Sequence, residues 1–156
     1  MPNENRVFIS TENLIDDPLW LPKVESFLLK VLERMEIQNW DLSVVFCNDE
    51  FIHTLNKTYR HIDSPTDVLS FENGEKYFNE DGEARILAGD IIISLDSVKA
   101  NAYAFYVSID EELRRLLIHG VLHLFGMDHT DNSPEQEMLQ LQEKILAETA
   151  EELYRE

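Results

Sequence analysis

Residues 42–59 read LSVVFCNDEFIHTLNKTY, and the pattern changes from that of a strand to that of a helix at Asn48. Residues 42–47 are rich in β-branched and aromatic side chains, which is typical of a strand. Asn48 or Asp49 can then cap the N-terminus of a helix that runs to about Tyr59. A strand followed at once by a helix indicates an α/β arrangement.

The same alternation extends in both directions along the chain. A short strand is expected at residues 7–10, followed by a helix at 21–35 whose apolar residues recur at helical spacing. Two further strands are expected at 67–71 and 86–95. The polar, glycine-containing residues between them, 72–83, are interpreted as a hairpin-like loop.

The last third of the sequence is predicted to be helical. A first helix begins near residue 95 and is expected to share one face among Leu95, Val98, Ala102, Phe105 and Tyr106. A second helix is expected at 111–125, capped by Ser108 or Asp110 and ended by Gly126. The final helix is expected to start with Ser133 as its cap and Pro134 at its first position, with a buried face formed by Met138, Leu141, Ile145 and Leu153.

The pattern therefore predicts a single domain over residues 1–156, of the α/β (α+β) class. A small mixed four-stranded sheet would pack with helices. The length of 156 residues and an apolar fraction of 44% suit one core of ordinary size, and no linker or repeat divides the chain.

Charge and cysteine content exclude several classes of protein. Thirteen Lys and Arg against 31 Asp and Glu give a net charge of −18, which excludes a protein that holds nucleic acid or membrane through bulk positive charge. The single cysteine, Cys47, can form no internal disulfide, and no signal-peptide pattern is present. No apolar stretch approaches the roughly 20 residues of a membrane span. A cytoplasmic protein without membrane contact is expected.

Three of the five histidines lie in residues 119–129, which read HGVLHLFGMDH. On a helix, His119 and His123 would lie about 40° apart around the axis and about 6 Å apart along it, so both imidazoles can reach one metal ion. Gly126 would end the helix and allow His129 to return as a third ligand. Three imidazoles leave a fourth position for water, as in catalytic zinc sites. The alternative is that these are core histidines, but an apolar helix gives imidazoles few hydrogen-bond partners.

The spacing of these histidines matches that of the metzincin metalloproteases, H-E-x-x-H-x-x-G-x-x-H, with one departure. Gly120 stands where those proteases carry the glutamate that moves the proton to the leaving amine. Peptide hydrolysis would therefore lack its usual acid and base. Cleavage of a phosphodiester could rely instead on the metal and on a cation that binds the phosphate.

Three blocks of this sequence resemble the YbeY family. The first block is matched by His119, Gly120, Leu122, His123, Leu124, Gly126, Asp128 and His129. The second is matched by Leu55, Asn56, Tyr59, Arg60, Asp63, Pro65, Thr66, Asp67, Val68, Leu69, Ser70 and Phe71, and the third by Gly89, Asp90, Ile91, Ile93 and Ser94. The resemblance implies a single-strand-specific metallo-endoribonuclease that matures the 3′ end of 16S rRNA in the ribosomal small subunit and acts in ribosome quality control.

The resemblance and the chemistry together suggest roles for individual residues. His119, His123 and His129 would bind the metal, with Zn²⁺ as the first expectation and nickel, copper or iron as alternatives. Arg60 would clamp the phosphate, although a cation there also suits the last turn of a helix. Asp128 would orient a ligand imidazole or shape the turn.

Two departures from the family pattern concern the substrate edge. Glu72 replaces the usual proline after Ser-Phe, and residues 73–83 carry Glu75, Glu80, Asp81 and Glu83. Acidic side chains there would disfavour an RNA backbone. The net charge of −18 would also slow the encounter with free RNA. Weak action of the isolated protein is therefore expected, dependent on magnesium or on docking through a ribosomal protein or an assembly GTPase.

Two other functions remain open at this point. One is a zinc-dependent hydrolase of the metalloprotease type, against which Gly120 argues. The other is a non-catalytic ribosome-assembly factor whose zinc is structural. RNA binding without cleavage would favour the second alternative.

Overall fold

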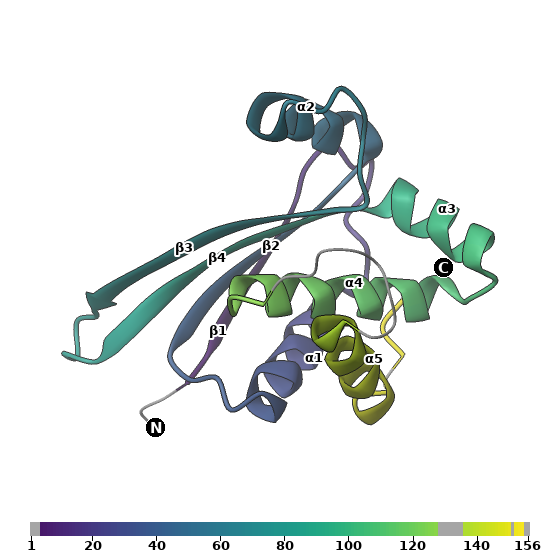
Figure 1. Cartoon of the computed structure of the whole chain (residues 1–156). Coiled ribbons are helices and arrows are strands. Elements are labelled where there is room, and N and C mark those ends of the chain that lie inside the picture. Colours follow the sequence, from purple (N-terminus) through teal and green to yellow (C-terminus); the bar gives the residue numbers. More distant parts are fainter. Residues whose placement is uncertain (1–3, 128–135, 151, 155–156) are drawn as a thin grey trace.

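The computed structural model describes residues 4–127, 136–150 and 152–154. Within these residues, strands and helices alternate as far as α2, two consecutive strands follow, and three helices come last, as Figure 1 shows. The elements are β1 (Arg6–Thr11), α1 (Leu21–Arg34), β2 (Trp40–Cys47), α2 (Asp49–Arg60), β3 (Val68–Phe78), β4 (Ala84–Ser94), α3 (Leu95–Phe105), α4 (Ile109–Leu124) and α5 (Glu137–Glu148).

The strands form one mixed sheet in the order β1-β2-β4-β3, which confirms the predicted fold class. β1 and β2 are parallel, as are β2 and β4, whereas β3 runs antiparallel to β4. In this register Val44 of β2 lies between Ile9 and Ile91. β3 forms an edge of the sheet, so the outward carbonyl groups of β3 are available to other parts of the chain.

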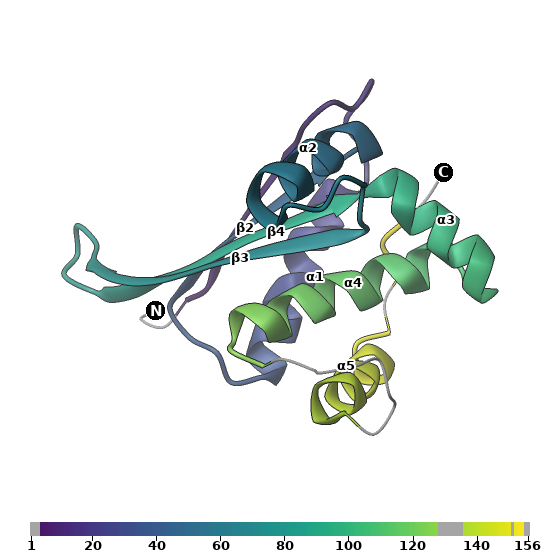
Figure 2. The same ribbon diagram turned by 45° about the horizontal axis from the view of Figure 1, so that its top comes forward.

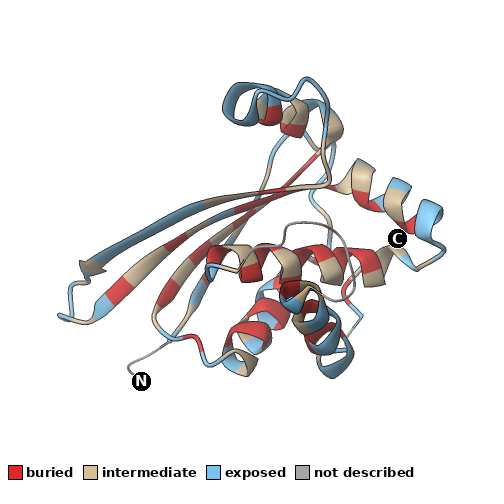
Figure 3. Cartoon of the chain, viewed as in Figure 1, coloured by how far each residue is buried: buried red, intermediate tan, exposed pale blue. Residues whose placement is uncertain are grey.

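Helices cover both faces of the sheet, as Figures 1 and 3 show. The main core lies between the sheet and the helices α1, α4 and α5, and Leu117 and Val121 of α4 are completely buried in it. A smaller core on the opposite face contains Ile52 of α2 together with Cys47 of β2. Burial raises the pKa of the Cys47 thiol to about 12, so this neutral thiol packs as a small buried hydrophobic group.

Predicted caps are confirmed at the two helices that build the site. The Asn48 side chain accepts a hydrogen bond from the backbone N–H of Phe51 (2.9 Å) and starts α2. Ser108 accepts from the backbone N–H of Glu111 (3.0 Å) and starts α4. In each helix the first of the two cap candidates named from the sequence is the residue that caps it.

The last helix differs from its prediction. α5 starts at Glu137 after Gln136, while Ser133 and Pro134 lie outside the described residues. Leu153 is buried but follows the end of the helix at Glu148 instead of lying on it. The reason is that an apolar residue can be buried by an extended segment as well as by a helix face.

The prediction of a loop at residues 72–83 is wrong for most of these residues. β3 continues to Phe78 and β4 begins at Ala84, so only the turn at 79–83 is irregular. The buried Arg85 guanidinium anchors the turn end of this long hairpin by donating to the Asp41 carboxylate of β2 (2.7 Å) and to the Trp40 carbonyl oxygen (3.2 Å). The strand residues are exposed on both faces, so they lack the apolar alternation that identifies a strand.

The prediction that one face of α3 is buried along its whole length is wrong at the C-terminal end. Val98 and Ala102 are buried, but Phe105 is 62% exposed and Tyr106 is 96% exposed. The last turn of α3 extends past the sheet, as Figure 1 shows, and helical spacing alone does not reveal where the covering layer stops. Among the described helices, none has both the length and the apolar character that crossing a membrane requires.

Candidate active site

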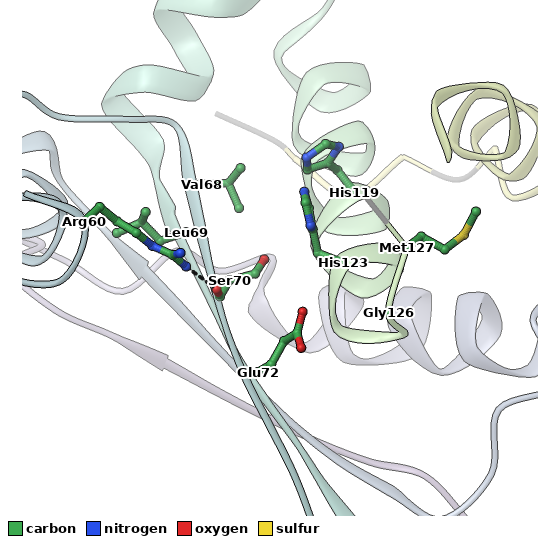
Figure 4. Close-up of a pocket in the computed structure, with 9 residues that line it drawn as sticks. All are labelled: Arg60, Val68, Leu69, Ser70, Glu72, His119, His123, Gly126 and Met127. Atoms are coloured by element: carbon green, nitrogen blue, oxygen red, sulfur yellow. Dashed lines mark hydrogen bonds between the residues drawn. The ribbon is translucent and has the colours of Figure 1, made fainter. Parts of the chain in front are cut away.

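His119 and His123 lie on one side of α4, near its C-terminal end. Their ring centroids are 4.7 Å apart and their planes meet at 70°, so the two imidazoles share one region of space as the helical spacing predicts. Both line a cleft of about 560 Å³ between α4 and β3, shown in Figure 4.

Arg60, at the end of α2, lines the same cleft from the opposite side. Its Nη2 donates to the backbone carbonyl oxygen of Ser70 on β3 (2.8 Å), and its guanidinium carbon lies 5.4 Å from the centroid of the Phe71 ring. The edge position of β3 makes the Ser70 carbonyl reachable. A guanidinium has five N–H donors, so this anchoring leaves donors that can bind an anion.

The remaining lining comes from β3 and from the segment after α4. These residues are Val68, Leu69, Ser70, Glu72, Gly126 and Met127. The exposed Glu72 carboxylate points into the cleft in Figure 4. Among the described residues, the cleft therefore combines two imidazoles and a guanidinium with one carboxylate that would repel a phosphate.

Gly120 allows α4 to lie close to the sheet. A Cβ atom at this position would be 2.8 Å from Cδ1 and 2.9 Å from Cγ2 of Ile91, and Ile91 is completely buried on β4. A side chain at residue 120 would force either Ile91 or α4 to shift, and a shift of α4 would carry the two histidines away from β4. Gly120 therefore sets the depth at which the imidazoles lie.

Gly126 turns the chain sharply at the end of α4. Its φ of +100° lies in the region that favours glycine. The backbone N–H of Gly126 donates to the His123 carbonyl (3.0 Å), and the N–H of Met127 donates to the Leu122 carbonyl (3.0 Å). This pair of bonds is a Schellman motif, and it confirms the predicted end of the helix.

The donor set suits a metal ion of the zinc type. Two imidazoles one helical turn apart are nitrogen ligands that Zn²⁺, Ni²⁺ and Cu²⁺ accept. The described residues contain no cluster of three or more His, Cys, Asp or Glu side chains placed to hold a metal. The expected third ligand, His129, and its neighbour Asp128 lie outside the described residues.

Comparison with known proteins identifies the family. The family model described as Endoribonuclease YbeY matches residues 9–150, which is most of the chain. This chain belongs to the YbeY endoribonuclease family. The match confirms the resemblance found in the three sequence blocks and the predicted enzyme class, an endoribonuclease.

Close relatives carry the same YbeY description. A protein of Treponema denticola named Endoribonuclease YbeY is 60% identical over 134 residues, covering 85% of this chain and 86% of the relative. One of Treponema pallidum strain Nichols, with the same name, is 55% identical over 148 residues, covering 95% of this chain and 92% of the relative. A solution structure from Thermotoga maritima aligns with a TM-score of 0.63 at 29% identity, covering 92% of this chain and 88% of that one.

In this YbeY chain, the basic side chains of residues 53–61 lie in two environments. Arg60 lines the cleft, whereas His53 contacts Asp63 (2.8 Å) and Lys57 lies 4.0 Å from the same carboxylate. Sequence reasoning did not identify Gln142, whose side-chain oxygen lies 2.7 Å from Nδ1 of His119. A glutamine in an acidic helix gives no signal until the two helices are packed together.

Gly120→Glu restores the glutamate of the metzincin pattern and is expected to destabilise the protein without creating a peptidase. Overpacking against Ile91 costs about 1–3 kcal/mol, and burying a carboxylate adds to this cost. Thermal unfolding and a casein-cleavage assay check both parts, with Gly120→Ala as the control for the Cβ atom alone. A stable Gly120→Glu variant that cleaves casein would favour the metalloprotease alternative.

Proposed function

We propose that this chain is a metal-dependent endoribonuclease of the cytoplasm that cleaves single-stranded RNA in maturation of the 16S rRNA 3′ end and in ribosome quality control. The observation that carries the proposal is the presence of Arg60, His119 and His123 in one cleft of a YbeY family member. Cationic and metal-binding groups facing each other suit a phosphodiester better than a peptide.

His119, His123 and His129 are proposed to hold one metal ion, with Zn²⁺ preferred and nickel, copper or iron as alternatives. Bound there, the ion would supply a Lewis acid for the phosphate oxygens. The two histidines on α4 are pre-arranged by the helix, because their relative position depends on backbone geometry and not on a flexible loop. Asp128 is proposed to orient one of the imidazoles.

Arg60 is proposed to bind the scissile phosphate and to neutralise the charge that develops on it. Its hydrogen bond to Ser70 and its contact with Phe71 hold the guanidinium at the rim of the cleft. A guanidinium held in advance needs little reorganisation when the charge develops, which is the condition for electrostatic catalysis. The exposed Tyr59, which packs edge-to-face on Phe71 (5.5 Å), adds an aromatic surface beside the cation.

The negative charge in and around the cleft suggests that the enzyme needs a docking partner to reach its RNA. Glu72 points into the cleft, and the net charge is −18. Long-range repulsion slows the encounter with free RNA. Productive cleavage is therefore proposed to occur on the ribosomal small subunit, with a ribosomal protein or an assembly GTPase holding the enzyme near its RNA.

The test is cleavage of a single-stranded 16S rRNA 3′-end fragment by zinc-loaded protein. Arg60→Ala is expected to lower kcat/KM by about 10²- to 10³-fold, because a fixed donor to the developing charge is lost. Arg60→Lys keeps the charge but not the planar set of donors, and an intermediate loss is expected. Lys57→Ala removes a charge from the same helix outside the cleft and serves as the control.

The outcomes separate the candidate functions. Arg60→Ala cutting at the wild-type rate would contradict the phosphate role and would point to a contaminating nuclease. The zinc-loaded wild type could also bind the RNA fragment without cutting it, both as free protein and in the presence of ribosomal small subunits. That result would favour a non-catalytic assembly factor.

A further inference from the structure

A buried glutamine on α5 contacts His119 on α4. The Gln142 side chain belongs to a residue that is only 6% exposed, and its Oε1 lies 2.7 Å from Nδ1 of His119. Figure 2 shows α5 below α4, on the side away from the sheet. The last described helix thus reaches the candidate active site through a hydrogen bond to His119.

The neighbours of Gln142 determine which end of its amide faces the histidine. Its Nε2 donates to Oε2 of Glu143 (3.1 Å). An ionised carboxylate can only accept, so the amide N–H₂ group must face Glu143 and the amide oxygen must face His119. An oxygen at 2.7 Å from Nδ1 requires that Nδ1 carry the proton.

Arg115 holds Glu143 in place. Its Nε and Nη2 donate to the two carboxylate oxygens of Glu143 at 2.9 and 3.0 Å, which is a bidentate pair. The hydrogen bond from Arg115 lowers the pKa of the Glu143 carboxyl group, so it stays ionised at neutral pH. Arg115 also pairs with Glu111 (3.0 Å) and Glu112 (3.2 Å) on its own helix.

These contacts form a chain of hydrogen bonds that runs from Arg115 through Glu143 and Gln142 to His119. Arg115 and His119 lie one turn apart on α4, while Glu143 and Gln142 come from α5. The chain therefore closes between the two helices, and the orientation of the imidazole depends on their packing.

We propose that Gln142 is a positioning residue that fixes the tautomer and the ring orientation of His119 for binding a divalent metal ion. With the proton on Nδ1, the lone pair of the neutral ring lies on Nε2, which is then the ligating nitrogen. Imidazole ligands in metal sites typically donate their other N–H to an oxygen in this way. The proposal rests on the proposed metal role of His119.

The test compares Gln142→Met, Gln142→Glu and Gln140→Met. Methionine is close to glutamine in size and favours helices, so it removes the hydrogen bond with little change in packing. Glutamate keeps an acceptor for Nδ1, and the exposed Gln140 on the same helix is the matched control. The first measurement is the Zn²⁺ dissociation constant by competition with a chromophoric chelator. The second is the tautomer of His119 from ¹⁵N NMR of metal-free protein with neutral imidazoles.

Gln142→Met is expected to weaken Zn²⁺ binding by about 10- to 100-fold and to lower the population of the Nδ1–H tautomer. Gln142→Glu should keep that tautomer and bind Zn²⁺ more tightly than Gln142→Met, and Gln140→Met should match the wild type.

Two results would overturn the role of Gln142 while leaving the proposed metal site intact. One is a Gln142→Met variant that binds Zn²⁺ as tightly as the wild type, while His119→Ala loses binding. The other is the Nε2–H tautomer in the metal-free wild type, a reading that needs no variant to fold. Zn²⁺ binding that survives His119→Ala would instead overturn the proposed metal site, and this inference with it.

Discussion

Gly89→Ala is expected to lower the free energy of unfolding by about 4 kcal/mol, because two costs combine at this position of β4. Gly89 has a φ of +135°, which is strained for any residue with a side chain. A Cβ atom there would also lie 2.1 Å from the carbonyl oxygen of Phe71 on the neighbouring strand. Backbone atoms of a sheet cannot give way without loss of strand pairing.

The site would be disturbed as well as the sheet. The added Cβ atom would lie 3.1 Å from Cδ2 of Leu124, the last residue of α4 and the one directly after His123. Equilibrium unfolding in urea measures the loss of stability. Gly82→Ala is the control, since Gly82 has a φ of +77° but open space around it, and a cost of about 1–2 kcal/mol is expected there. Equal stability of the two variants would contradict the close approach at Gly89.

His123→Ala is expected to produce the largest loss of activity, exceeding the loss of about 100-fold that removal of a supporting hydrogen bond causes at a metal site. Its effect on stability should depend on zinc. A ligand bound only by the folded state adds about 2.7 kcal/mol at a concentration about 100 times its dissociation constant. Zinc should therefore raise the melting temperature of the wild type and leave that of His123→Ala nearly unchanged.

Calorimetric melting with and without zinc, together with a zinc assay of the dialysed protein, checks this expectation. His53→Ala is the matched control. His53 lies on the surface of α2, contacts Asp63 beyond the end of that helix, and does not line the cleft. Without zinc, His123→Ala should melt close to the wild type, since the half-buried ring leaves little cavity. Stoichiometric zinc in His123→Ala with the same melting temperature would rule out His123 as a ligand.

α4 serves both the core and the cleft. Its sheet-facing side includes Gly120 and the completely buried Leu117, while His119 and His123 line the cleft. The position of the two imidazoles is therefore tied to the packing of the main core. Substitutions such as Gly89→Ala or Gly120→Glu are expected to change stability and the site together.

Local patterns in the sequence were sufficient to predict several helix boundaries and the shared helix face of two site residues. The change of periodicity at Asn48, the cap at Ser108 and the stop at Gly126 identified helices α2 and α4. The spacing of His119 and His123 predicted that they share a helix face, because helical geometry relates residues four apart without any tertiary contact. Backbone geometry over one or two turns is a property of the local sequence.

The tertiary structure decided which of these faces meet. Arg60 reaches the cleft because β3 is an edge strand that offers the Ser70 carbonyl, and no pattern around residue 60 contains that information. Gln142 contacts His119 because α5 packs against α4, and Arg85 anchors an exposed hairpin through Asp41 of a different strand. Periodicity shows which side of an element is apolar, but strand order, register and helix packing depend on interactions between distant residues.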